Sequence, residues 1–97
     1  MLFAVLFEDN PNAPGDVRQR HMADHLAFLE RHAGQIQVAG PLFEHGEAAG
    51  GLWLVNAATV GEVDAMVHAD PFWPTGLRES YRVLEWRQVF TRDTPAS

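Results

Sequence analysis

The sequence predicts an α+β domain whose secondary-structure elements follow the order β-α-β-β-α-β. Short apolar runs rich in β-branched and aromatic residues alternate with segments of helical spacing, and turns containing proline or glycine separate them. The length of 97 residues suits one domain with one core. We therefore expect a single domain over residues 1–91, followed by a flexible tail at 92–97.

The first half of the chain is predicted to form a strand, a helix and a second strand. The apolar run 2–7 is typical of a buried strand, and the prolines that follow it cannot continue a ladder. Apolar residues at helical spacing predict a helix over 17–33, which Asp16 can cap. Its expected core-facing stripe consists of Met22, Leu26, Leu29 and Ala33. Residues 35–42 predict the second strand.

A polar, glycine-rich connection over 44–51 is expected to lead into a third strand over 52–55. Thr59 with Glu62 three residues later is typical of a capping box, which opens the second helix. That helix should end at Asp70, because the residue before a proline is disfavoured in helical conformation. After it, the sequence predicts an aromatic turn over 72–77 and a last strand over 81–90.

This order of elements is the ferredoxin-like arrangement, in which both helices pack on one face of an antiparallel sheet. The other face is expected to be apolar, since the last strand presents Leu84, Trp86 and Phe90 on one side. A large apolar face is rarely left in water. We therefore expect a homodimer in which a second copy covers this face and encloses a cavity between the two sheets.

The composition excludes several functional classes. The chain carries 7 basic and 13 acidic groups, for a formal net charge of −6, and an acidic surface repels nucleic-acid backbones. The absence of cysteine excludes disulfides, thiolate catalysis and cysteine-ligated zinc. No apolar stretch approaches the ~20 residues that span a bilayer. We expect a cytoplasmic protein that binds neither nucleic acid nor membranes.

Histidine is the unusual feature, because three of the 5 histidines lie on the first predicted helix. His21, His25 and His32 form a stripe of their own, and His25 lies nearest the apolar stripe. We expect His25 at the margin of the buried region, where an imidazole is partly desolvated yet reachable, as general acid–base catalysis requires. A structural or surface histidine is an equally simple interpretation of the same spacing.

A metal site is a further alternative, because His21 and His25 are separated by four positions. No HExxH pattern and no suitably spaced carboxylate accompany them, so we expect neither a metal nor another cofactor. Asp70 is the second candidate catalytic residue. It can be a simple turn former, or it can reach His25 if the two helices lie side by side, and it would then orient the imidazole.

Several segments, in order along residues 1 to about 90, resemble one family. They are His-Leu-Ala-Phe-Leu at 25–29, Ala-Gly-Pro-Leu at 39–42, Asp-Pro-Phe at 70–72, Gly-Leu at 76–77 and Trp-Arg-Gln-Val-Phe at 86–90. Together they are similar to the YCII-related (YciI-like) domain of the dimeric α+β barrel superfamily. The resemblance implies a ferredoxin-like dimer with a His–Asp pair at His25 and Asp70. Some relatives eliminate HCl from a ring intermediate, and related barrels isomerise muconolactones.

The sequence thus leads to the hypothesis of a cofactor-free enzyme. His25 would transfer a proton, Asp70 would orient it, and the reaction would be an elimination or isomerisation of a small cyclic molecule. The alternative is a non-catalytic module for small-molecule binding or dimerisation, in which the same pair is structural.

Overall fold

A computed structural model of the chain describes residues 1–93 and confirms the expected order of elements. The elements are β1 (Leu2–Asp9), α1 (Val17–Arg31), β2 (Ile36–Glu44), β3 (Glu47–Asn56), α2 (Val60–Ala69), the 3-10 helix η1 (Trp73–Thr75) and β4 (Arg78–Glu85). Of the tail expected at 92–97, residues 94–97 lie outside the described residues.

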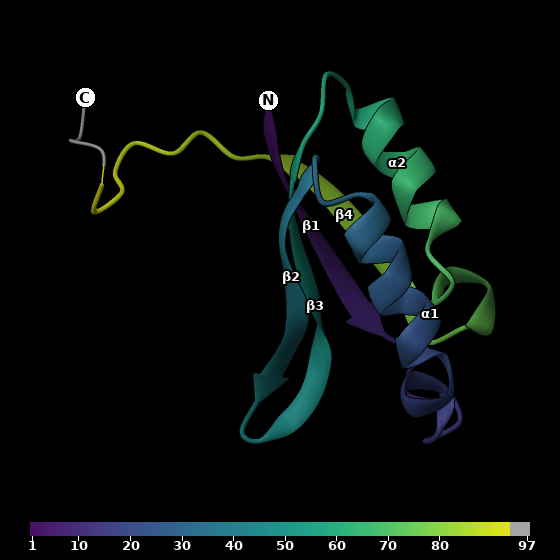
Figure 1. Cartoon of the computed structure of the whole chain (residues 1–97). Coiled ribbons are helices and arrows are strands. Elements are labelled where there is room, and N and C mark those ends of the chain that lie inside the picture. Colours follow the sequence, from purple (N-terminus) through teal and green to yellow (C-terminus); the bar gives the residue numbers. More distant parts are fainter. Residues whose placement is uncertain (94–97) are drawn as a thin grey trace.

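The four strands form one antiparallel sheet in the order β2-β3-β1-β4. Both helices cover the same face of this sheet, and the opposite face carries no helix (Figure 1). This is the predicted ferredoxin-like fold. The core lies between the helices and the sheet, where alternate residues of β1, namely Phe3, Val5 and Phe7, are buried against both helices.

The predicted loop over 44–51 is wrong, because strands occupy most of it. Only His45 and Gly46 separate β2 from β3, and both have positive φ (52° and 82°), as a two-residue hairpin turn of type I′ requires. Gly46 thus acts as a turn residue, whereas Gly50, also predicted to lie in the loop, lies in β3. A Cβ on Gly50 would lie 2.0 Å from the Phe7 carbonyl oxygen, so this glycine permits β1 and β3 to approach closely.

The last strand also differs from the prediction of 81–90, since β4 begins at Arg78 and ends at Glu85. Its neighbour β1 begins at Leu2, and the Trp86 backbone N–H still bonds the Leu2 carbonyl at 2.8 Å. Beyond this point β1 offers no further partner. Val89 and Phe90 are therefore outside the sheet and 69% exposed, on a segment that runs away from the side of the helices (Figure 1).

Helix α1 is rotated relative to the expected stripe, and this is the main correction to the sequence analysis. Its buried residues are Val17, His25 and Phe28, whereas Leu26 is 50% exposed and Ala33 lies beyond the end of the helix. The histidine stripe thus faces inward. Burying an imidazole costs free energy unless its ring nitrogens find hydrogen-bond partners in place of water. His25 therefore requires such a partner inside the core.

The two helices begin differently. Thr59 caps α2 as predicted, because its hydroxyl oxygen accepts a bond of 3.2 Å from the Glu62 backbone N–H. Asp16 stands at the expected cap position of α1 but makes no capping bond, and its carboxylate instead pairs with Arg20 at 3.2 Å. The prediction that Asp16 is the N-cap residue is therefore correct, but the predicted capping hydrogen bond is not formed.

The helix-free face of the sheet carries exposed apolar residues, as expected. We call it the open sheet face; Val38, Leu42 and Leu84 are 58%, 41% and 42% exposed on it, and the polar residues Glu8, Ser80 and Arg82 are exposed at its β1–β4 side. Half-buried Leu6, Leu52 and Leu54 lie between them. Among residues 1–93, neither helix has the length and hydropathy that crossing a bilayer demands.

Candidate active site

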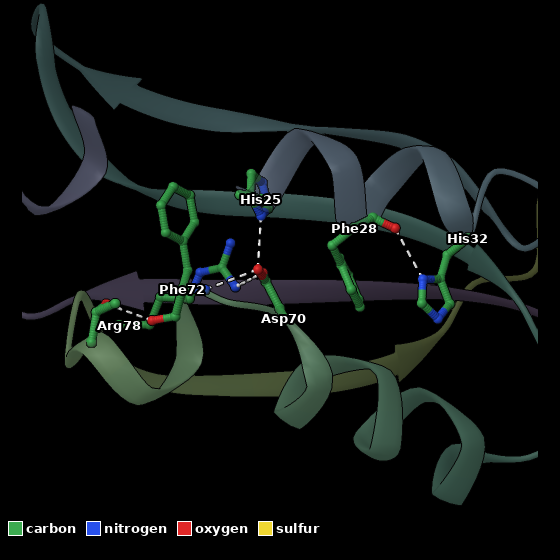
Figure 2. Close-up of polar contacts among 7 residues, drawn as sticks. His25, Phe28, His32, Asp70, Phe72 and Arg78 are labelled. Atoms are coloured by element: carbon green, nitrogen blue, oxygen red, sulfur yellow. Dashed lines mark hydrogen bonds and ion pairs between the residues drawn. The ribbon is translucent and has the colours of Figure 1, made fainter. Parts of the chain in front are cut away.

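His25 and Asp70 meet in the core. The His25 Nδ1 and the Asp70 Oδ1 are 2.8 Å apart, and Figure 2 shows the imidazole pointing from α1 toward the carboxylate that follows α2. His25 is 8% exposed and Asp70 is fully buried. The contact that the sequence allowed but did not compel is therefore present. His25 lies deeper than the predicted margin, because Asp70 satisfies its ring nitrogen.

The chain after α2 is built to aim the Asp70 carboxylate. Asp70 ends the helix in extended conformation (φ −66°, ψ 128°), and Pro71 follows it. Its Oδ1 also accepts the Phe72 backbone N–H at 3.0 Å, an Asx-type turn. Asp70 is thus both the turn former and the histidine partner that the sequence analysis considered as alternatives.

The same carboxylate is held in its charged form. Burial alone would raise the pKa of Asp70, but hydrogen bonds from His25 and the Phe72 backbone and the charge of Arg78 outweigh it, so the pKa lies below its ordinary value of 3.8. A carboxylate can only accept, so the His25 Nδ1 carries the proton of this bond. In the neutral imidazole, Nε2 is then the basic nitrogen.

Arg78, the first residue of β4, was missed by the sequence analysis. Its Nη1 donates to the Asp70 Oδ2 at 2.7 Å, and its side chain is only 7% exposed. The guanidinium carbon lies 3.9 Å from the centre of the Phe7 ring, within cation–π range. Burial lowers the pKa of Arg78 and the Asp70 charge opposes this shift. The predicted strand began three residues later, so Arg78 fell between the predicted turn and the predicted strand and was assigned to no face of the sheet.

An aromatic ring fixes the imidazole from one side. The Phe72 ring stacks on His25 with 4.2 Å between centroids and 21° between planes. Phe72 is itself 1% exposed. From the sequence this phenylalanine was placed in the aromatic turn over 72–77, and in the structure it also forms a wall of the site.

A cavity of about 100 Å³ opens beside the pair. His25, Phe72 and Arg78 form one part of its wall, and Trp53 contributes another. The remaining lining comes from Asp9, Arg18, Met22, Leu26, Leu29, Ala39, Gly40, Pro41, Gly50 and Gly51. Three members of the expected core stripe of α1 thus line the cavity, and of these Met22 and Leu29 also pack against the core. This cavity lies on the helix-covered side of the sheet, so it is not the cavity expected between two paired sheets.

The other helix histidines do not join the site. His32 is the C-cap of α1, and its Nδ1 donates to the Phe28 carbonyl at 3.0 Å (Figure 2). Neither His21 nor His32 lines the cavity. Within residues 1–93, no three histidine or carboxylate side chains come together as metal ligands.

The chain is thus an α+β protein of ferredoxin-like fold with a buried His–Asp pair beside a small cavity. The chain belongs to the YCII-related domain family, whose model matches residues 1–87. It is 31% identical over 71 residues to an uncharacterised protein, YjpA, of Bacillus subtilis strain 168, covering 71% of this chain and 79% of the relative.

A solved structure resembles this one closely. It is 5-chloro-2-hydroxyhydroquinone dehydrochlorinase (TftG) from Burkholderia phenoliruptrix AC1100, in complex with 2,5-dihydroxybenzoquinone. The TM-score is 0.77 and the sequence identity 33%, over 90% of this chain and 94% of the other. The dehydrochlorinase is an enzyme that binds a small cyclic molecule.

Proposed function

We propose that this protein is an enzyme that catalyses proton transfer on a small cyclic organic molecule, in an elimination or an isomerisation, without a cofactor. The observation that carries the proposal is the buried His25–Asp70 pair at the wall of the cavity. The similarity to a dehydrochlorinase that binds a quinone supports it. The catalytic residues of the proposal are His25 and Asp70.

The proposed proton acceptor is the His25 Nε2. It makes no hydrogen bond within residues 1–93, and it is not sealed from solvent, since no buried side-chain nitrogen or oxygen there is left without a partner. Asp70 holds the proton on Nδ1 and stabilises the imidazolium that forms when Nε2 takes a second proton. The pair therefore has the two parts that general-base catalysis needs.

In an elimination, Nε2 removes a proton from a ring carbon, the C–H electron pair forms the new C=C bond, and a halide leaves with its bonding pair. The products are the unsaturated ring, a halide ion and the proton on His25, so the step needs no oxidant or reductant. In an isomerisation, His25 returns the same proton to another carbon. Apolar walls from Trp53 and Phe72 keep water away from these steps.

The test is chloride release from chlorinated hydroxyhydroquinones by the purified protein. We expect catalysis by the wild type and a loss of about 10²- to 10⁴-fold in His25→Ala, the usual contribution of a general base. His21→Ala is the matched control, because His21 lies one helical turn earlier and outside the cavity. A wild-type protein without turnover, or a fully active His25→Ala, would contradict the proposal.

One observation favours a second candidate, a non-catalytic module that binds a small molecule. Asp70 is satisfied by three protein donors, from α1, the following turn and β4, as a purely structural carboxylate would be. Under this alternative the wild type binds ring compounds but does not transform them. Single-turnover analysis of the mixture by mass spectrometry separates the two functions.

We also propose a homodimer through the open sheet face. Val38, Leu42 and Leu84 are exposed on a face that no helix covers, and such apolar faces are usually covered by a partner. A closed pair of identical chains is the commonest way to cover them.

A further inference from the structure

We propose that Arg78 is the anion-recognition residue of the cavity, and that the occupant is a single-ring organic anion, a carboxylate or an enolate-type oxyanion. The proposal rests on the same site as the proposed function, and it specifies the chemical class of ligand that this site binds. It does not require that the ligand be transformed.

The first argument is the number of unused donors on Arg78. A guanidinium has five N–H donors, and within residues 1–93 only Nη1 has a partner, the Asp70 Oδ2 at 2.7 Å. Its other nitrogens make no hydrogen bond there, and none of them is sealed from solvent. Because the side chain is only 7% exposed and lines the cavity, the space that these donors reach is the cavity side of the residue.

The second argument is the charge around the cavity. Its charged lining residues are Asp9, Arg18 and Arg78. Arg18 pairs with Asp9 at 3.0 Å, whereas the partner of Arg78 at 2.7 Å is Asp70, which is fully buried behind the lining. The carboxylate that balances Arg78 is thus outside the cavity, and the cavity wall presents two cations and one anion. Arg78 also cannot lose its proton under ordinary conditions. A ligand oxyanion is the complement of such a group, with charge-assisted hydrogen bonds.

The third argument concerns shape. The Arg78 guanidinium lies over the Phe7 ring, with Trp53 and Phe72 within 5.5 Å, so its position is fixed by aromatic contacts. The cavity volume of about 100 Å³ is comparable with cavities of ~150 Å³ that hold a benzene ring. A single ring therefore fits this volume better than a two-ring ligand does. Gly51 lies beside Phe7, on the same face of β3 as Trp53, and adds no side chain to the cavity.

The chemistry of the site agrees with this assignment. When a base removes a proton from a ring carbon next to a carbonyl, negative charge develops on the carbonyl oxygen. A fixed guanidinium beside His25 would stabilise that charge, and Arg78 is joined to His25 through the shared carboxylate. The same donors would hold the anion of a ligand that is already ionised.

The first experiment compares two probes of nearly equal shape, benzoate and benzamide, by titration calorimetry with the wild-type protein at neutral pH. We expect benzoate to bind at least tenfold more tightly. Equal affinity, tighter binding of benzamide, or no binding of benzoate at millimolar concentration would overturn the inference. This comparison does not depend on the folding of any variant.

The second experiment uses Arg78→Gln and Arg78→Lys. Loss of charged hydrogen bonds should weaken benzoate binding about 10- to 100-fold in Arg78→Gln, and Arg78→Lys should recover part of it because the charge remains. Arg31→Gln is the matched control: it removes the same charge from an exposed position of α1 outside the cavity and away from the open sheet face, and benzoate affinity should stay within twofold. Equal weakening by Arg31→Gln would show that net charge alone attracts the probe and would overturn the inference.

The inference and the proposed function fail in different ways. Preference for benzoate that depends on Arg78, without turnover of any ring compound, contradicts the proposed function and leaves the ligand class intact. Turnover that depends on His25, with equal binding of benzoate and benzamide, supports the proposed function and contradicts the assignment of Arg78 as the anion-recognition residue.

Discussion

The Asp70 Oδ1 lies 2.8 Å from the His25 Nδ1, although 45 positions separate these residues in the chain. The other oxygen of Asp70 lies 2.7 Å from the Arg78 Nη1. One fully buried carboxylate therefore joins α1, the end of α2 and the start of β4. The site exists only where these three segments meet, so its chemistry and the stability of the fold are coupled.

Substitution of His25 by alanine should destabilise the fold as well as remove activity. The change removes one donor from a buried carboxylate and a ring stacked on Phe72, so we expect the free energy of unfolding to fall by about 1–3 kcal/mol. Urea denaturation measures it, with His21→Ala as the control expected to change little. A neutral His25→Ala would mean that the pair contributes nothing to stability. Because the residue is buried, stability alone does not separate a catalytic from a structural pair.

The stability of the protein should decline in acid partly through Asp70. Its pKa is lower in the folded chain than the ordinary 3.8, so below that value the unfolded chain binds more protons. The stabilisation is therefore complete above the unfolded pKa and is lost as the pH falls through the folded pKa. Asp70→Asn should flatten this part of the pH profile in urea denaturation, whereas Asn in place of exposed Asp24 should not. If the free energy of unfolding fell equally steeply with pH in the wild type and in Asp70→Asn, Asp70 would not be a cause of the acid sensitivity.

Tyr81 should ionise at unusually high pH. Burial and a hydrogen bond of 2.9 Å to the Asp64 carboxylate raise its pKa from 10.0 to about 12. Because the chain has 1 tyrosine, the ultraviolet absorbance of the phenolate reports this group directly. Asp64→Asn should lower the midpoint toward the ordinary value. An unchanged titration midpoint of Tyr81 in Asp64→Asn would show that Asp64 does not contribute to the raised pKa.

A charge on the open sheet face should dissociate the proposed homodimer. We expect light scattering to show a dimer for the wild type at micromolar concentration, and a monomer for Val38→Glu or Leu84→Glu, because a buried unpaired carboxylate is costly. Val60→Glu is the matched control, since Val60 is 47% exposed on the helix side. A monomeric wild type, or a dimer that tolerates both charges, would argue against this surface.

The order of elements was readable from the sequence because it depends on local properties. The apolar run at 2–7 produces the strand β1, and the Thr59 hydroxyl with the Glu62 backbone N–H produces the start of α2. The ends of the elements were less accurate where they depend on a neighbour. The strand β4 ends at Glu85, whose partner Phe3 is the second residue of β1, and no local signal shows where that neighbour begins.

The sequence by itself determined the fold class and indicated His25 and Asp70 as candidates, and the resemblance to the YCII-related domain implied that they pair. Only the tertiary structure decided that His25 and Phe28 are among the buried residues of α1, while Met22 and Leu29 are only partly buried. Periodicity ranks faces by hydrophobicity, whereas burial of His25 depends on a partner 45 positions away. The same is true of Arg78: its burial requires Asp70 and the Phe7 ring together, and only the folded chain brings them to one place.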